Sequence, residues 1–173
     1  MKNTRKLIFM ALLLSISLVL HYIEGFIPVP IPAPGVKLGL ANIITMVTIV
    51  LFGFRETFVL VILRSFMGAV FGGVISSFFF SIAGGVLSAI IMYLLYHYYK
   101  DYFSLMGISI VGAIFHNIGQ LLVASALVSN FGIFIYLPIL MLSGIITGYF
   151  VGLTSKYIVR VLSNHLKFIE KKI

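Results

Sequence analysis

Apolar segments long enough to cross a membrane dominate this sequence. The first runs from Leu7 to Ile27, and a membrane-spanning helix needs about 20 such residues. Of the 173 residues in the chain, 61% are hydrophobic and only 9% are charged. A soluble domain of this size cannot keep that much apolar surface away from water. The sequence therefore predicts an all-α integral membrane protein, with a single transmembrane domain over residues 1–173.

Glycine, proline and charged residues divide the chain into about six apolar spans. We expect these spans at residues 6–27, 38–52, 56–71, 77–97, 107–128 and 133–157. The tail, residues 158–173, places apolar residues among lysines, which is typical of a basic amphipathic helix lying on the membrane surface. The first span follows a basic start, as in a signal peptide, but it lacks a small-residue cleavage site. We therefore interpret it as a retained helix.

The basic residues predict the orientation in the membrane. The net charge is +8, and the positive residues lie mainly at span ends and in the tail. If the N-terminus is inside, then Lys2, Lys6, Arg55 and Lys100 are inside with the tail, and Lys37 is outside. Loops on the cytoplasmic side normally carry the excess of lysine and arginine. We therefore expect both termini in the cytoplasm, and we expect no nucleic-acid partner.

A proline-rich segment separates the first two spans. Residues 28–42 read PVPIPAPGVKLGLAN, and the alternating prolines exclude a helix, so the segment is a stiff extended connector. Lipid cannot satisfy the backbone of such a segment, which must face water, a cavity or other protein. Lys37 and Asn42 lie where the next helix begins. We expect the connector to close over a pocket in the outer half of the protein.

Polar side chains inside or near the spans are the candidate ligand-binding residues. They are His21, Glu24, Asn42, Arg64, His116, Asn117 and Gln120. A charge at the bilayer centre costs roughly 2.5–3.5 kcal/mol, so such groups normally face the interior of a bundle. Helical spacing predicts that His116, Asn117 and Gln120 share roughly one face. We expect these groups to line an outward-opening cavity, with Arg64 binding an anion at its floor and Lys37 at its rim.

Structural roles stay open for two of these residues. Arg64 can instead pair with Glu24 or Glu56 and hold helices together. A single interior histidine such as His116 is more often structural than a ligand, although its polar neighbours favour a pocket. The glycines at 144, 148 and 152, one helical turn apart, predict a face on which helices approach closely.

The inventory of residues argues against catalysis by this chain. Asp101 is the single aspartate, so an aspartate-rich site for Mg²⁺ and diphosphate cannot be built from it. The chain has no cysteine, no HExxH motif and no Walker A motif. We expect no enzymatic activity, no metal site and no cofactor.

Several blocks of sequence resemble those of a known family. They are PGVKLGLANI at 34–43, LFGFRE at 51–56, Arg64, SIAGG at 81–85 and GAIFHNIGQ at 112–120. Together they resemble the Gx transporter family, also labelled heptaprenyl diphosphate synthase component I. That family is similar to the substrate-binding S components of energy-coupling-factor transporters. The resemblance implies a six-helix bundle in a prokaryotic plasma membrane, whose first outer loop caps an outward-facing vitamin site.

The same resemblance implies a protein partner. S components dock on a transmembrane coupling protein, which works with ATPase subunits, through an Ala-x-x-x-Ala motif on the first helix. The nearest match here is Ala11 and Ser15, which keeps small residues but departs from the motif at Ser15.

Three functions are compatible with these features. We favour a substrate-binding component of an uptake transporter for a small anionic or polar-headed molecule, either vitamin-like or related to isoprenoid and quinone precursors. The second is a non-catalytic membrane accessory of prenyl diphosphate or quinone biosynthesis, binding a diphosphate or a membrane lipid. The third is a structural subunit of a membrane redox assembly.

Overall fold

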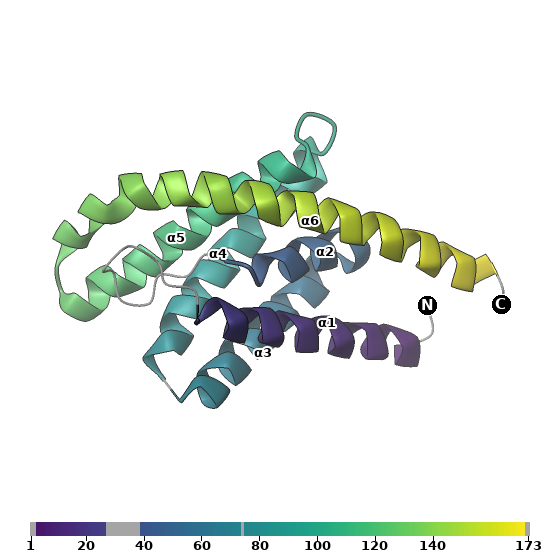
Figure 1. The fold of residues 1–173 in the computed structure, drawn as a ribbon, viewed down its shortest axis with the longest axis horizontal. Coiled ribbons are helices and arrows are strands. Elements are labelled where there is room, and N and C mark those ends of the chain that lie inside the picture. The colour runs from purple at the N-terminus through teal and green to yellow at the C-terminus, as the bar shows by residue number, and fades with distance from the viewer. Residues whose placement is uncertain (1–2, 27–38, 74, 172–173) are drawn as a thin grey trace.

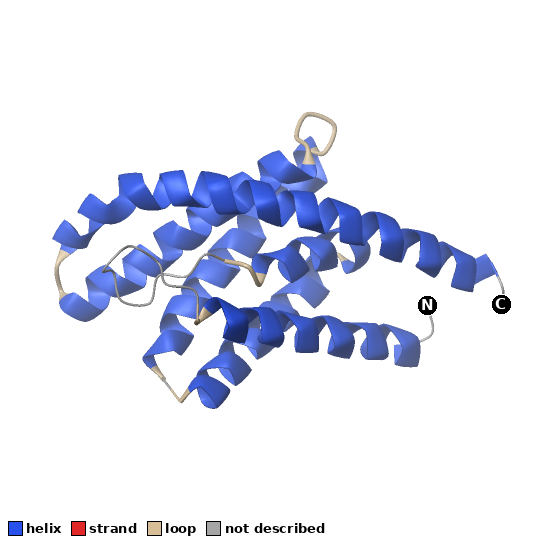
Figure 2. Ribbon diagram, in the orientation of Figure 1, coloured by secondary structure: helices blue, strands red, loops and turns tan. Residues whose placement is uncertain are grey.

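The protein is a bundle of helices. The computed structural model describes residues 3–26, 39–73 and 75–171, whose path is shown in Figure 1. Its elements are α1 (Asn3–Glu24), α2 (Asn42–Phe52), α3 (Phe54–Gly72), α4 (Ser76–Tyr99), α5 (Leu105–Val128), the 3₁₀ helix η1 (Phe131–Tyr136) and α6 (Leu137–Lys171). No β-strand occurs in these described ranges (Figure 2). The predicted all-α architecture is confirmed.

Four helices in the described part of the chain are long and apolar enough to cross a membrane. They cover Thr4–Glu24, Ser76–Tyr99, Leu105–Val128 and Phe131–Asn164. Helix α3 has 19 residues but carries three charged residues, Arg55, Glu56 and Arg64, and is not among these four. With these four helices among the six α-helices described, the chain is an all-α membrane protein, and four of the about six expected spans are long and apolar enough to cross a membrane.

Helix α2 lies at the centre of the bundle. Its residues from Asn42 to Ile49 are all buried, and it contacts α1, α3, α4, α5 and α6. Its 11 residues rise only about 16 Å, roughly half of the hydrocarbon thickness of a bilayer. The expected second span, 38–52, is therefore a buried half-length helix that begins at Asn42.

A single glycine separates α2 from α3. Gly53 has φ 89° and ψ −169°, a region that only glycine adopts readily. The chain can therefore leave one helix and enter the next within one residue.

Helix α6 differs from the expectation at both of its ends. Residues 131–136 form η1, and α6 then continues without interruption for 35 residues to Lys171. No glycine or proline follows Gly152, so nothing in the sequence ends the helix near residue 157. The tail continues along the axis of α6 instead of forming a separate surface helix (Figure 1). In the same view α1 begins and α6 ends on the same side of the picture.

The α5–α6 interface is built on the predicted glycine face. A Cβ atom on Gly148 would lie 2.6 Å from the Cα of Ile110, and one on Gly152 would lie 2.5 Å from the Cα of Met106. These distances leave no room for a side chain between the two backbones. The prediction of a close helix contact at this face is confirmed.

Candidate functional site

Polar side chains from five helical segments meet around a small internal cavity. Its lining residues are His21, Glu24, Gly39, Ala41, Asn42, Arg64, Ser81, His116 and Gln120. They come from α1, the start of α2, α3, α4 and α5. All of these side chains are at least nine-tenths buried. The cavity measures about 10 Å³, which is room for about one water molecule.

Arg64 is the most deeply buried charge in this polar cluster. Only 1% of its surface is exposed, and its Nη1 lies 3.4 Å from the hydroxyl of Thr45 in α2. It is attracted electrostatically to Glu24. Glu56 instead forms an ion pair with Lys6. The sequence allowed Glu24 or Glu56 as a partner for Arg64. In the structure, Glu24 is the one close enough to attract Arg64 electrostatically.

The cluster contains polar atoms without a partner among the described residues. Asn42 is 3% exposed, and neither its Oδ1 nor its Nδ2 makes a hydrogen bond there. The Nε of Arg64 is also unpaired within the described part of the protein. A buried polar group left unsatisfied costs about 1–3 kcal/mol. The cavity therefore contains two hydrogen-bond donors, Nδ2 of Asn42 and Nε of Arg64, and one acceptor, Oδ1 of Asn42, that no described residue uses.

Glu24 ties the end of α1 to the start of α2. Its carboxylate accepts a hydrogen bond from the backbone N–H of Gly39. Gly39 has φ +84°, and a Cβ atom there would lie 2.9 Å from the Nδ2 of Asn42. Both the backbone conformation and the available space therefore require glycine at the edge of the cavity.

Two glycines make room for the imidazole rings. A Cβ atom on Gly68 would lie 2.9 Å from the ring of His21. One on Gly84 would lie 2.8 Å from the backbone oxygen of His116 and 3.0 Å from its ring. The close approach of α3 to α1 and of α4 to α5 therefore brings both histidines to the cavity.

Asn117 lies on a different face of α5 from His116 and Gln120. Its Nδ2 donates a hydrogen bond of 2.8 Å to the backbone oxygen of Leu140 in α6. A Cβ atom on Gly144 would lie 3.2 Å from that Nδ2. The expected common face holds for His116 and Gln120, which lie one turn apart, whereas a rotation of about 100° per residue turns Asn117 toward α6.

Of the remaining predicted residues, Ala11 and Ser15 lie apart from the cavity. Lys37 and the connector 28–37 fall outside the described residues. Ala11 and Ser15 are exposed on α1, and the hydroxyl of Ser15 donates to the backbone oxygen of Ala11 at 2.9 Å. These two are therefore placed for contact with something outside the bundle.

Two contributors were not identified from the sequence. Ser81 lines the cavity and its hydroxyl lies 3.0 Å from that of Ser65, while Thr45 contacts Arg64. Thr45 is three residues after Asn42, so helical spacing placed it on the same face of α2. Within the described residues, no three His, Asp or Glu side chains are grouped to hold a metal ion.

The cavity joins a guanidinium group, a carboxylate, two imidazoles and two amides in a setting without bulk water. Such a setting strengthens hydrogen bonds and charge–charge contacts. The arrangement can hold one small polar or anionic group by several hydrogen bonds at once.

Comparison with known families shows which family the chain resembles. A sequence profile of the family described as heptaprenyl diphosphate synthase component I matches residues 13–158. The chain belongs to this family. The matched range includes every residue that lines the cavity. Comparison with curated proteins and with solved structures gave no match, so the likeness of this family member to S components stays a prediction.

Proposed function

We propose that this chain is the substrate-binding membrane component of an uptake system for a small molecule with an anionic or polar group. The observation that supports the proposal is the unsatisfied pair in the cavity, the amide of Asn42 and the Nε of Arg64. A carboxylate or phosphate oxygen would accept hydrogen bonds from both. Intramembrane ionisable groups that face a bundle interior commonly mark substrate pathways.

Substrate entry requires the lining of the cavity to move apart. The cavity of about 10 Å³ is far smaller than a typical ligand pocket, which measures about 300–1,000 Å³. The contact between Glu24 and Gly39 joins two segments of its wall. Binding of a vitamin-sized molecule therefore separates α1 from the start of α2. In the proposed orientation, with cytoplasmic termini, this opening faces outward.

The first test is to identify what co-purifies with the protein. Mass spectrometry of the detergent-purified chain is expected to find a small anionic or polar-headed molecule. Arg64→Ala and Asn42→Ala should each weaken its binding by about tenfold to hundredfold, because a charge-assisted hydrogen bond contributes roughly 1.5–3 kcal/mol. Arg64→Lys should not restore binding, since an ammonium group lacks the planar fork.

Asn117→Ala is the matched control for this experiment. It removes an amide from α5 that bonds to Leu140 outside the cavity. The control should lower the melting temperature and leave the affinity of the folded protein nearly unchanged. If Asn42→Ala and Asn117→Ala lose the same affinity for the molecule, the cavity is not its binding site.

The proposed uptake system also includes a coupling partner on α1. Ala11 and Ser15 are exposed, and small residues allow another helix to approach closely. Ala11→Trp is expected to abolish capture of a partner complex while substrate binding persists. Leu12→Trp, at the neighbouring exposed position, is the control. Equal capture by wild type and Ala11→Trp would exclude this face as the interface.

A second candidate function is favoured by the family description. Its wording names one component of a heptaprenyl diphosphate synthase, and such a component works with another subunit. In this alternative the chain is a non-catalytic membrane accessory of prenyl diphosphate synthesis. Co-purification of a prenyl or quinone lipid with a soluble synthase subunit, in place of a vitamin-like molecule, would favour it.

A further inference from the structure

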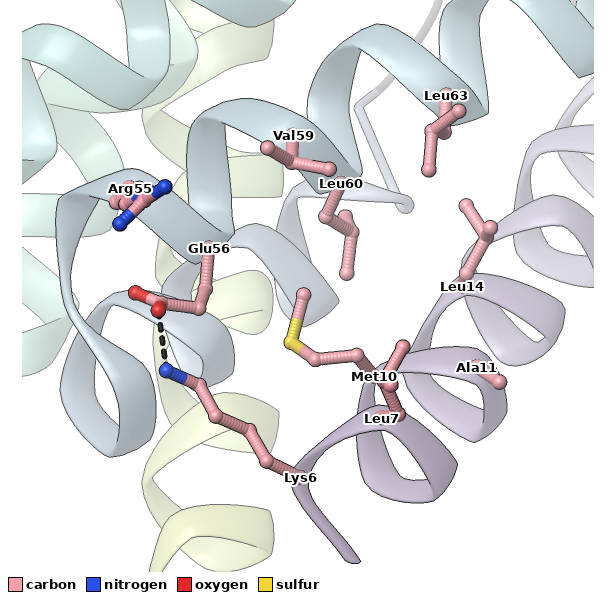
Figure 3. A pocket seen from close by; sticks show the side chains of 10 residues that line it. All are labelled: Lys6, Leu7, Met10, Ala11, Leu14, Arg55, Glu56, Val59, Leu60 and Leu63. Carbon is pink, nitrogen blue, oxygen red and sulfur yellow. Dashed lines mark hydrogen bonds and ion pairs between the residues drawn. The ribbon is translucent and has the colours of Figure 1, made fainter. Parts of the chain in front are cut away.

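A long groove runs between α1 and α3 on the outside of the bundle. Its volume is about 530 Å³, and it is separate from the polar cavity. Figure 3 shows the side chains that line it: Lys6, Leu7, Met10, Ala11, Leu14, Arg55, Glu56, Val59, Leu60 and Leu63. Leu60 is only 1% exposed, whereas Leu7 and Leu63 remain exposed by 70% and 42%. The groove therefore has an apolar floor and apolar sides that open outward.

The charged residues of the groove lie together at one end. Figure 3 shows Lys6, Glu56 and Arg55 at that end, with Leu14 and Leu63 toward the other. Lys6 and Glu56 form an ion pair that links α1 to α3. Arg55 is exposed and makes no ion pair among the described residues. Among the lining residues at this end, Glu56 neutralises one of the two cations and leaves a single net positive charge.

The side chains and charges of the groove lining favour an amphiphile as its occupant. A helix with its side chains is about 10–12 Å wide, and closely packed membrane helices meet through small residues. Apart from Ala11, the apolar lining consists of leucine, methionine and valine side chains, which do not form the small-residue face on which membrane helices meet closely. A hydrocarbon chain with an anionic head matches both the apolar walls and the charged end.

We infer that this groove holds a hydrocarbon chain of a singly charged anionic phospholipid, with its phosphate at Arg55. A phosphodiester carries one negative charge, which the single net positive charge at the groove end balances. A diphosphate carries several negative charges and would leave most of them uncompensated there. The surrounding bilayer supplies phospholipid at high local concentration along the open side of the groove. This inference goes beyond the proposed uptake function: none of the groove residues lines the polar cavity, and of the groove lining the proposed coupling face shares Ala11.

Native mass spectrometry with defined lipids tests the inference. The detergent-purified protein is mixed with equal amounts of phosphatidylglycerol and phosphatidylcholine of identical acyl chains. The wild type should retain one phosphatidylglycerol in preference to phosphatidylcholine. Arg55→Gln should reduce this retention by about tenfold, as expected for loss of a charge-assisted hydrogen bond. Arg5→Gln is the matched control, since Arg5 is an exposed cation outside the groove lining.

A second pair of variants tests the apolar part of the groove. Val59→Phe adds bulk to the lining and should reduce retention of the lipid, whereas Ile62→Phe places the same new side chain on α3 outside the lining. Melting temperatures confirm that each variant is folded.

The inference is overturned if the wild type retains the two lipids equally. It is also overturned if Arg5→Gln reduces retention of phosphatidylglycerol as much as Arg55→Gln does. It is also overturned if geranylgeranyl diphosphate displaces phosphatidylglycerol at equal concentration. Arg64→Ala should weaken substrate binding and leave lipid retention unchanged. A failure of the lipid inference can therefore be distinguished from a failure of the proposed uptake function.

Discussion

At Arg64, a single side chain links the stability of the bundle to the chemistry of its cavity. Its guanidinium lies beside Thr45 and within the field of Glu24, but one of its donors has no partner in the described structure. A buried ion pair contributes little net stability, because desolvation offsets the attraction. Removing one partner nevertheless costs much, since it leaves the other charge buried alone. The unused donor is what favours a ligand-binding role beside this structural one.

A double-mutant cycle measures the structural part of this role. Arg64→Met and Glu24→Gln should each destabilise the protein, Arg64→Met by about 3–5 kcal/mol, and the double variant should lose clearly less than the sum. The melting temperature in detergent is the measurement. The Lys6–Glu56 pair is the comparison, with side chains that are 40% and 20% exposed, and its cycle should give a coupling of only about 0–1 kcal/mol. A coupling between Arg64 and Glu24 no larger than this would show that they do not act as a pair.

At the level of elements, glycines bring helices close enough to place the polar cluster. In α4, Gly84 meets the backbone of His116, and Gly85 would place a Cβ atom 3.0 Å from Nη2 of Arg64. In α6, Gly148 meets the backbone of α5. Backbone atoms cannot rotate away as a flexible side chain can. These contacts therefore fix the spacing of α4, α5 and α6.

Substitution of Gly148 tests this spacing. Gly148→Ala should destabilise the protein by about 1–3 kcal/mol, because its Cβ atom would lie 2.6 Å from the Cα of Ile110. Gly72→Ala, at the end of α3, is the control, since nothing lies within 4 Å of its added Cβ atom. That change should be neutral or stabilising by up to about 1 kcal/mol, because alanine favours a helix. Similar melting temperatures for the two variants would contradict a close α5–α6 contact.

At the level of the whole molecule, the proposed orientation places the two ends of α5 on opposite sides of the membrane. Tyr102 precedes α5 and is 85% exposed, whereas Phe131 follows it and is 76% exposed. The positive-inside tendency places Tyr102, next to Lys100, in the cytoplasm.

Cysteine labelling tests this orientation directly, because the chain contains no cysteine of its own. In intact cells, an impermeant maleimide should label Phe131→Cys but should label Tyr102→Cys only after the membrane is opened. Ala33→Cys should behave like Phe131→Cys, and Lys171→Cys like Tyr102→Cys. The reverse pattern would place the termini outside and would make the cavity open inward.

The sequence by itself determined the class of the protein and most of its polar cluster. A chain with 61% hydrophobic and 9% charged residues must bury its helices in a membrane, because water cannot solvate that much apolar surface. The cost of placing Glu24 or Arg64 in lipid also forced such groups inward. Their gathering around one cavity was therefore predictable from residue types and span positions.

Only the tertiary structure decided which neighbours these residues have. The sequence left Arg64 with two possible partners; in the structure Glu56 pairs with Lys6, and Glu24 lines the same cavity as Arg64. Local spacing placed Asn117 with His116, but contact with α6 gave its amide a different partner. Apolar length predicted a second span over residues 38–52, but α2 begins only at Asn42, after the positive φ of Gly39, and is buried. Helical periodicity and transfer energies can be evaluated from neighbouring residues in the sequence. The contact partners of a side chain depend instead on which faces of sequence-distant helices pack together.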